Sequence, residues 1–296
     1  MSFGKLRTSW EHRRIMKKAN DIKDIKITLN LNQIVIILLV IASFLLGSVW
    51  SKLRSGGGES VKISQENQKT PTAAVQPTKP PFNPEKSNKP EVKFFVMSYC
   101  PYGNQAEAGM EPVYQLLKNK VDWQPRYVIY KDYCSRSTGS EKTTCEKNNC
   151  LKAGDEIYCS MHGVAELNQD IREICAFNLG DLNKWWQFVS GTNKNCNVGN
   201  IETCWTGEAK KAGLDTNKIT GCLNREKFAL AKKETAEMDK YQAFGSPAVF
   251  INGAAYNGGR SPEDYKKAIC NAFETQPEEC KTVLGQETAA TAGGCN

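Results

Sequence analysis

The feature that most constrains the fold is the stretch from Lys93 to Glu107, where an apolar run ends at a cysteine and a helical pattern follows at once. Residues 92–98 are rich in β-forming side chains, so we expect a strand there. Pro101 suits the first turn of a helix because its fixed φ is already helical. The unpaired N–H groups and the dipole of a helix N-terminus stabilise an anion, so a thiolate at Cys100 is favoured. The pattern predicts a strand–turn–helix unit with a reactive thiol at the turn.

The residue three positions after this cysteine is Gly103, where a dithiol enzyme carries its second thiol. A dithiol enzyme releases its mixed disulfide when the second thiol attacks the first. That step cannot run within the segment Cys100–Gly103. A single thiol could still isomerise disulfides, form glutathione adducts or be resolved by another thiol, for which we nominate Cys295. The alternative is that Cys100 is a relic in a binding domain or part of a structural disulfide.

The N-terminal segment predicts a membrane anchor. Residues 1–32 hold eight Lys or Arg against three acids, and no charged residue lies between Lys26 and Lys52. We expect residues 33–50 to be a transmembrane signal anchor, with the basic segment on the cytoplasmic side of the cytoplasmic membrane and the rest outside. A cleaved signal peptide is less favoured, because the segment before the apolar run is long and no clear A-x-A site follows it. The positive charge is thus a topology signal, and we expect no nucleic-acid partner.

The rest of the chain divides by composition. Residues 51–90 carry three consecutive glycines and several prolines without helix or strand periodicity, which predicts a flexible linker. We expect a folded α/β domain over residues 91–283 and a disordered tail over 284–296. All twelve cysteines follow residue 99. Their density indicates an oxidising compartment and a disulfide framework.

The order of elements expected within the domain is strand, cysteine, helix, strand, helical insertion, strand, turn, strand and helix. The second strand is expected over 123–130 and a disulfide-stapled loop over 131–160. Helices are expected over 163–190, 201–212, 225–240 and 262–275. An Asn-Gly turn at Asn252 predicts the hairpin that follows Pro247.

This order resembles a thioredoxin-like domain, and residues 92–280 resemble the gamma-interferon-inducible lysosomal thiol reductases and their bacterial relatives of Dsb type. The motifs that carry the resemblance are Cys159-Ser-Met-His162-Gly163, with Cys175 after it; Cys204 with Ile219-Thr-Gly-Cys222; and Val249-Phe-Ile-Asn-Gly253, followed by Cys270 and Cys280. The last of these pieces is also similar to the thioredoxin-like part of plant vacuolar sorting receptors, which is not an enzyme. The resemblance implies that Pro247 is a cis-proline facing the active cysteine.

The resemblance also implies a function, a membrane-anchored extracytoplasmic thiol–disulfide oxidoreductase or isomerase. Cys100 would be the nucleophile and Pro247 would present the substrate backbone, with Pro101, Tyr102, Gly103 and Ser246 lining the substrate site. Disulfide- or thiol-containing proteins would be the substrates, an unidentified membrane redox partner would exchange electrons, and no bound cofactor or metal is implied. The alternative is a non-catalytic peptide-binding module with a degenerate site.

The remaining cysteines are expected to be structural. We expect pairs Cys204–Cys222 and Cys270–Cys280, each across a short helical hairpin or helix end, and Cys175 with Cys196. Two further bridges are expected among Cys134, Cys145, Cys150 and Cys159.

Three further hypotheses concern a metal site in the 131–160 loop, the role of His162 and the aromatic residues. A zinc site from Cys145, Cys150, Cys159 and His162 is disfavoured by its irregular spacing. His162 is expected to be a structural residue at a turn, with a catalytic base as the alternative. Trp185, Trp186 and Phe244 could form a substrate surface. Aromatic residues at helical spacing more often belong to the core, so we favour the core for these three.

Overall fold

A computed structural model describes residues 82–289 of the chain. The basic segment 1–32, the predicted span 33–50 and most of the linker 51–90 lie outside the described residues, as does Cys295. Among the residues that are described, none of the helices combines the length and the apolar run needed to cross a membrane.

The centre of the domain is a four-stranded sheet with the order β2-β1-β5-β6. Its strands are β1 (Glu91–Val96), β2 (Asp122–Tyr127), β5 (Ala248–Ile251) and β6 (Ala254–Tyr256). β1 pairs with β2 in parallel and with β5 in antiparallel register. The mixed sheet confirms the expected thioredoxin-like order, because the crossover from β1 to β2 contains a helix and the β5–β6 pair closes through a two-residue turn.

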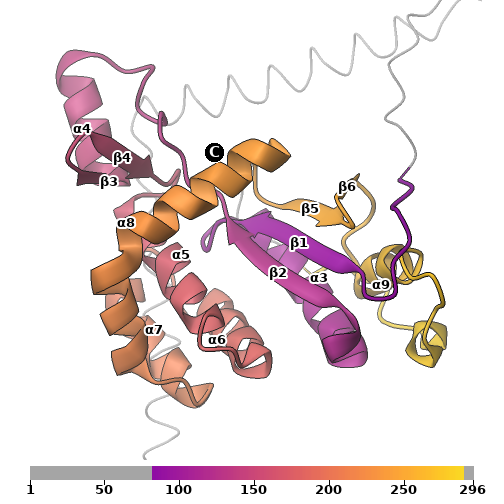
Figure 1. Cartoon of the computed structure of the whole chain (residues 1–296). Helices are drawn as coiled ribbons and strands as arrows, with labels where there is room; N and C mark the ends of the chain where they lie inside the picture. The colour runs from indigo at the N-terminus through magenta and orange to yellow at the C-terminus, as the bar shows by residue number, and fades with distance from the viewer. Residues whose placement is uncertain (1–81, 290–296) are drawn as a thin grey trace, which may run out of the picture. The chain divides into compact units, whose positions relative to one another are not determined.

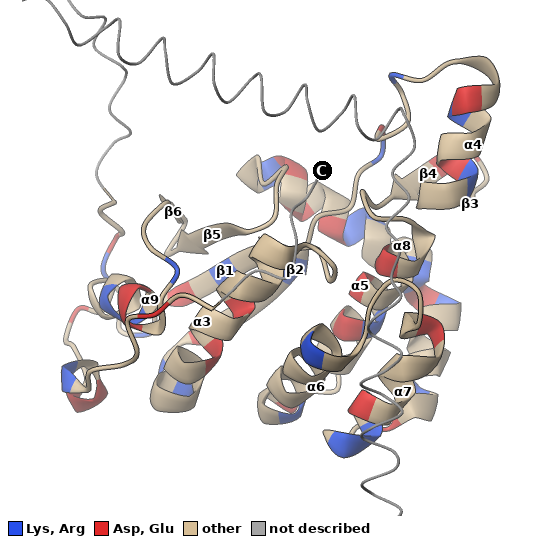
Figure 2. Cartoon of the chain, turned by 180° about the vertical axis from the view of Figure 1, so that it is seen from behind, with Lys and Arg blue, Asp and Glu red and all other residues tan. Residues whose placement is uncertain are grey.

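Helices cover the two faces of this sheet. α3 (Pro101–Leu117) and α9 (Pro262–Cys270) pack together on one face, with the short 3-10 turn η1 (Lys118–Lys120) after α3, whereas α8 (Thr216–Tyr241) crosses the other face (Figures 1 and 2). α9 begins with a capping box in which Ser261 Oγ accepts from the N–H of Asp264. A 3-10 turn, η2 (Glu278–Lys281), follows α9.

The helical insertion lies beyond the β2 edge of the sheet and consists of α5 (Val164–Phe177), α6 (Leu182–Asn195), α7 (Ile201–Lys211) and the first half of α8 (Figure 1). α8 starts at residue 216, earlier than expected, because Asp215 caps it by accepting from the N–H groups of Asn217 and Lys218. The insertion was expected, and it is confirmed.

The segment 131–160 is not a loop, as the sequence had suggested. It contains α4 (Gly139–Asn149) and a hairpin of β3 (Cys150–Ala153) and β4 (Glu156–Cys159), and it projects from the domain beside α8 (Figure 1). α4 has no buried residue and no apolar stripe, so its sequence carries no hydrophobic helical period. The helix is therefore invisible to periodicity.

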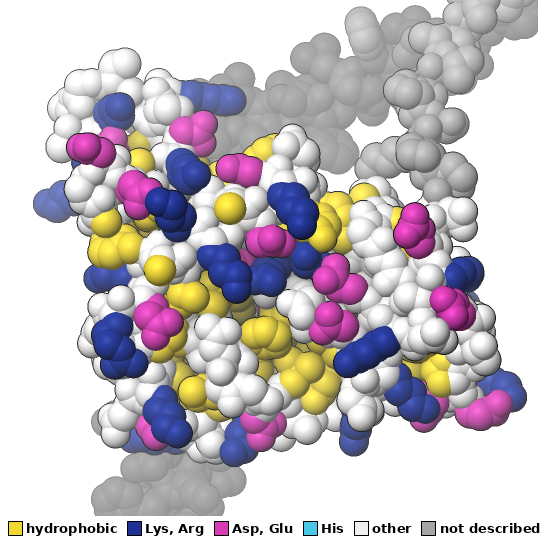
Figure 3. Space-filling model, viewed as in Figure 1, with side chains coloured by type: hydrophobic (Ala, Val, Ile, Leu, Met, Phe, Trp, Pro, Cys, Tyr) yellow, Lys and Arg dark blue, Asp and Glu magenta, His cyan; other side chains and the backbone are white. Residues whose placement is uncertain are grey.

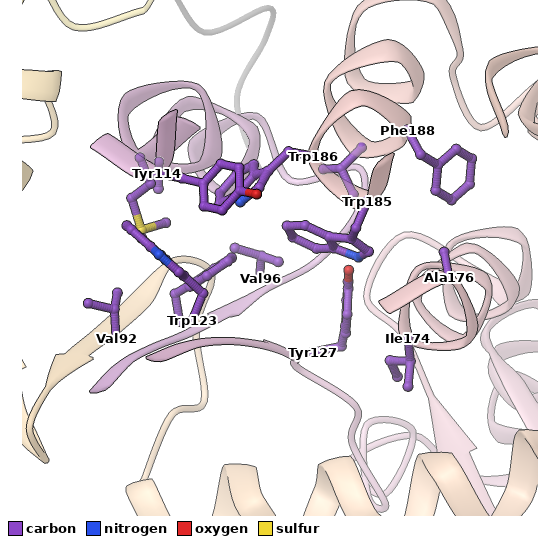
Figure 4. Close-up of a cluster of buried hydrophobic side chains, with 14 of the residues drawn as sticks. Val92, Val96, Tyr114, Trp123, Tyr127, Ile174, Ala176, Trp185, Trp186 and Phe188 are labelled. Carbon is purple, nitrogen blue, oxygen red and sulfur yellow. The ribbon is translucent and has the colours of Figure 1, made fainter. Parts of the chain in front are cut away.

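The hydrophobic core lies between the sheet, α3, α5 and α6. Trp185 and Trp186 of α6 are 0% and 1% exposed, and they gather with Tyr114 of α3 and Trp123 of β2 (Figure 4). Ring centroids of Tyr114 and Trp186 are 5.7 Å apart in a stacked arrangement. The two tryptophans are thus core residues, as expected, whereas Phe244 is 50% exposed.

Five disulfides are present in the described part: Cys134–Cys145, Cys150–Cys159, Cys175–Cys222, Cys196–Cys204 and Cys270–Cys280. The last pair and the two bridges of the 131–160 segment agree with expectation.

Two expected pairs, Cys204–Cys222 and Cys175–Cys196, are wrong. Cys175 lies on the face of α5 that packs on α8, which brings it to Cys222, 47 positions away in the sequence. Cys196 directly follows α6 and Cys204 lies in the first turn of α7, so the short α6–α7 connection joins them.

The boundaries of the domain are wider than predicted. Ser87, expected in the linker, forms a parallel bridge with Phe273, and the ring of Phe82 packs edge-on against Tyr256 at 5.2 Å. The residues of the predicted disordered tail that are described, 284–289, form no helix or strand, but some of them are hydrogen-bonded to the domain. The N–H of Leu284 donates to Glu263 Oε2 at 2.8 Å. Both segments are held by pairing with residues near the two ends of α9, and composition alone does not reveal this pairing.

Charge is distributed evenly over the face seen in Figure 3. Lys or Arg and Asp or Glu side chains are interspersed there around a hydrophobic patch near the middle. That face therefore carries no extended field of one sign.

Candidate functional site

Cys100 lies at the N-terminal cap of α3, with Pro101 as the first helical residue. Its N–H donates to the carbonyl of Met97 at 3.0 Å, which closes the turn after β1. The side chain is 2% exposed and packs in a small apolar cluster with Met97 and Val128. The strand–turn–helix unit is therefore confirmed, and the sulfur lies just beneath the surface.

The segment before β5 lies across this turn. The Ser246–Pro247 peptide bond is cis, as the resemblance implied. The carbonyl of Ser246 accepts from Cys100 Sγ at 3.5 Å, and Ser246 Oγ accepts from the N–H of Met97 at 3.0 Å. The cysteine and the cis peptide, 146 positions apart in the sequence, are thus in contact.

The position of the missing second thiol is closed to a side chain. A Cβ built on Gly103 would lie 2.5 Å from Ser246 Oγ and 3.3 Å from the carbonyl of Met97. Ser246 Oγ cannot simply turn away, because it accepts the hydrogen bond from Met97 that ties β5 to the turn. Gly103 is therefore required by close packing here, and the turn does not accommodate a second thiol at this position.

Two acids of α5 hold the turn from below. The N–H of Ser98 donates to Asp170 Oδ1 at 3.0 Å, and the hydroxyl of Ser98 donates to the same oxygen. The N–H of Tyr99 donates to Glu166 Oε1 at 2.8 Å. Both acids are fully buried. Hydrogen bonds to two carboxyl groups of the helical insertion therefore fix the backbone conformation that presents Cys100.

Further buried carboxylates extend this layer. Burial raises the pKa of Asp170, and the neighbouring charge of Glu166 adds to it. Burial raises the pKa of Glu173 to about 7, against hydrogen bonds from Gln169 and Tyr127 that lower it. Burial also raises the pKa of Glu107, with the charge of Glu173 as the next cause. Burial therefore favours the protonated form of the carboxyl groups on which the site rests.

His162 is part of the same layer. The ring Nδ1 of His162 lies 2.8 Å from Glu166 Oε1. The backbone N–H of His162 donates to Glu166 Oε2 at 3.2 Å. The hydrogen bond to Glu166 raises the pKa of His162, against partial burial, which lowers it. Since Gly163 behind it is the N-terminal cap of α5, this geometry agrees with a structural role at a turn.

The zinc hypothesis is not supported by this arrangement. In the described chain, the sulfurs that lie within 4.8 Å of one another are those of Cys134, Cys150 and Cys159, and the group includes neither Cys145 nor His162. The cysteines of this group are all joined in disulfides.

Exposed aromatic side chains flank the turn. Tyr102 is 41% exposed and lies under the guanidinium of Arg260, 5.5 Å from the ring centroid. Phe244 is exposed two residues before Ser246, and its carbonyl accepts from the hydroxyl of Tyr130 at 2.9 Å.

Several residues of the site were missed by the sequence reasoning. Glu166, Asp170 and Glu173 recur at positions i, i+4 and i+7 on the same side of α5 as Leu167 and Ile174. Acids placed within the apolar face of a helix are a signal of buried polar function, and this signal was available. The closure of Gly103 by Ser246 was not, because it depends on a contact between distant segments.

The chain belongs to the vacuolar sorting receptor thioredoxin-like domain family. The sequence profile of this family matches residues 100–270, more than half of the chain. No curated protein matches the chain.

Among solved structures, the chain is similar to the reduced form of the disulfide bond oxidoreductase DsbG from Mycobacterium tuberculosis, with 17% identity, a TM-score of 0.44, and coverage of 70% of this chain and 88% of that one. It is also similar to reduced DsbA from Mycobacterium tuberculosis (16% identity, TM-score 0.42, 70% and 93% coverage). A third is oxidised BdbD from Bacillus subtilis (14% identity, TM-score 0.42, 64% and 90% coverage).

Proposed function

We propose that this chain is a thioredoxin-like thiol–disulfide oxidoreductase or isomerase that uses Cys100 as its attacking thiol. The observation that carries the proposal is the contact between Cys100 Sγ, at the N-terminus of α3, and the carbonyl of the cis Ser246–Pro247 peptide. A helix N-terminus stabilises the thiolate that attacks.

The first step is a thiol–disulfide exchange. The thiolate of Cys100 attacks one sulfur of a substrate disulfide, the substrate sulfur–sulfur bond breaks, and the other substrate sulfur leaves as a thiolate. The products are a mixed disulfide on Cys100 and one free substrate thiol. Pro247 would align the substrate backbone, and Pro101, Tyr102, Gly103 and Ser246 would form the surface around the sulfur.

The location of the protein forms part of the same proposal. An N-terminal span at residues 33–50 would anchor the domain outside the cytoplasmic membrane, where five disulfides are stable. Its substrates would be disulfide- or thiol-containing proteins, and a membrane redox partner would supply or accept electrons.

The test is the capture of the mixed disulfide. The full-length protein is treated with a dithiol at a concentration that leaves the five disulfides intact, freed of reductant and mixed with a reporter peptide disulfide. Mass spectrometry then locates the adduct. We expect it on Cys100, and we expect C100S to lower it to background. A wild-type protein that forms no adduct at Cys100 under these conditions contradicts the proposal.

The second candidate is a non-catalytic peptide-binding module, and the family match favours it, since the profile describes a receptor domain. The surface beside Pro247, with Tyr102 and Phe244, would then hold a peptide without exchange. Binding of a peptide library that contains no cysteine, unchanged in C100S and weakened in Y102A, supports this candidate. Binding that requires a substrate disulfide argues against it.

A further inference from the structure

A pocket of about 430 Å³ opens between α3 and α6, beside the turn that presents Cys100. Tyr99 and Pro101, the residues on either side of Cys100, both contribute to its lining, and Trp186 and Val189 contribute from α6. A pocket of this volume is of the size that small-molecule ligands occupy. The residues of the cis peptide are not part of the lining, so the exchange proposed above leaves this pocket unused.

Three buried polar atoms of the lining residues have no hydrogen-bond partner in the described chain: Tyr99 Oη, Glu107 Oε1 and Trp186 Nε1. The side chains of Glu107 and Trp186 are almost wholly buried, with 3% and 1% of each residue exposed. Buried polar groups in native proteins are nearly always paired, because an unpaired group has lost its water without gaining a partner. The three atoms therefore indicate a ligand that brings polar groups of its own.

All three atoms can donate a hydrogen bond. An indole nitrogen is a donor only, and a phenol hydroxyl can donate. Glu107 Oε2 accepts from Asn193 Nδ2 at 2.7 Å, which leaves Oε1 for a ligand. Burial raises the pKa of Glu107, and the neighbouring charges of Glu173 and Cys100 add to it, so the protonated carboxyl that can donate from Oε1 is favoured. Donors that converge on one cavity match an acceptor-rich group, and a carboxylate offers acceptors only.

The other lining charges and the distance to the thiol define the rest of the ligand. Lys194 and Glu111 line the pocket with opposite charges, which suits a molecule that carries both a carboxylate and an ammonium group. Glu107 follows Cys100 by seven residues, about 10.5 Å along α3, and its side chain leans back toward the helix N-terminus. An extended peptide of two to three residues spans about 7–10 Å. A peptide-like molecule of that length can therefore reach from Glu107 to the turn.

We propose that this pocket binds a small peptide-like thiol with a carboxylate group, and that this thiol resolves the mixed disulfide on Cys100. The inference rests on the proposed function. It supplies, as a co-substrate, the second thiol that the packing around Gly103 excludes from the turn.

The resolving step is a second thiol–disulfide exchange. The thiolate of the bound molecule attacks Cys100 Sγ in the mixed disulfide, the bond to the substrate sulfur breaks, and the substrate leaves as a thiolate. A second molecule of the same thiol then attacks the sulfur of the first, which frees the Cys100 thiolate and forms the small-molecule disulfide. Over the cycle the substrate disulfide gains two electrons, and two molecules of the small thiol lose one each.

The decay of the Cys100 adduct measures this site. The full-length protein is loaded with the reporter peptide at Cys100, and release of the peptide is followed against the concentration of glutathione, the tripeptide thiol used as the probe. We expect the rate to saturate with glutathione, because binding in the pocket precedes the exchange. With 2-mercaptoethanol, which has no carboxylate, we expect a linear dependence over the same range.

Variants that remove a single donor test the pocket itself. Y99F removes one hydroxyl and retains the ring, and W186F removes the indole N–H. We expect each to raise the half-saturating concentration of glutathione about 10-fold, the effect of losing one hydrogen bond to a charged group. Release by 2-mercaptoethanol in the same variant is the reference for a change at Cys100. Y158F is the matched control and should behave as the wild type, since Tyr158 is fully buried in β4 and does not line the pocket.

Calorimetry with S-methylglutathione separates binding from exchange, because this probe has no free thiol. We expect it to bind C100S, and we expect the double variant Y99F/C100S to bind it about 10-fold more weakly.

The outcomes separate the two claims. A release rate that stays linear in glutathione, a half-saturating concentration that is equal in wild type, Y99F and W186F, or no binding of S-methylglutathione to C100S overturns the thiol site and leaves the proposed function standing. No adduct of the reporter on Cys100 overturns the proposed function itself.

Discussion

Two cysteine-bearing regions of this domain are built by opposite means. The projection made of α4, β3 and β4 contributes no buried residue from α4 and is closed by two disulfides. The turn that presents Cys100 is instead held by hydrogen bonds to Asp170 and Glu166 and by packing against Ser246. In the projection, disulfides supply the stability that a larger hydrophobic core would otherwise give. At the turn, the core and its buried acids position a cysteine. The same residue type thus has a structural role in the projection and, in the function we propose, a chemical role at the turn.

The comparison predicts that the stability of the region around the turn depends strongly on pH and that the stability of the projection does not. The pKa of Glu173 is raised from 4.5 to about 7, so between these values the folded protein holds a proton that the unfolded chain has released. Stability is therefore highest at low pH and falls as pH rises through about 7, by about 3 kcal/mol for this group. Asp170 and Glu107, whose pKa values are also raised, act in the same direction.

The check is a set of urea unfolding curves between pH 4.5 and 8. We expect E173Q to flatten the decline, whereas the exposed matched control E278Q should retain it. Equal slopes in the wild type and E173Q would remove Glu173 as the cause.

Opening a disulfide of the projection should produce the next largest effect. The Cys150–Cys159 bridge closes a sequence separation of 9, and loss of a loop of this size costs somewhat less than 3 kcal/mol. In C150S/C159S we expect rapid proteolysis confined to residues 131–160, with unchanged adduct formation at Cys100. Loss of Cys100 reactivity in this variant would show that the two regions depend on each other.

Filling the closed position should disturb the turn and spare the projection. G103A places a Cβ 2.5 Å from Ser246 Oγ, and overpacking of this kind costs about 1–3 kcal/mol. The double variant G103A/S246G removes the obstructing hydroxyl, and we expect it to recover part of the loss seen in G103A when it is compared with S246G alone. Thermal unfolding measures each step; a G103A protein as stable as the wild type would refute the steric argument.

The smallest effect is expected at the contact between the projection and α8. Lys232 Nζ lies 2.6 Å from Glu156 Oε1, and both side chains are exposed. Exposed ion pairs contribute little because water and salt screen them. K232A should therefore leave the urea midpoint and the proteolysis pattern unchanged, and release of the projection in this variant would mean that the ion pair, and not the disulfides, holds it.

Much of the fold was predictable from local pattern. The β-forming run before Cys100, the helical period after it and the Asn-Gly turn before β6 are each specified within a few residues. α4 was not predicted because it has no buried residue and therefore no apolar periodicity in its sequence. The start of α8 was placed too late, because the cap at Asp215 was not used as a start signal.

The site divides in the same way. The sequence alone determined that a thiol stands at a helix N-terminus without a second cysteine three residues on, because both facts concern neighbours in the chain. Only the tertiary structure decided that Ser246 occupies the space beside Gly103, that Asp170 and Glu166 hold the turn, and that Cys175 pairs with Cys222. These contacts join segments 47 to 149 positions apart. Their partners are selected by how helices pack on the sheet, which residue spacing does not reveal.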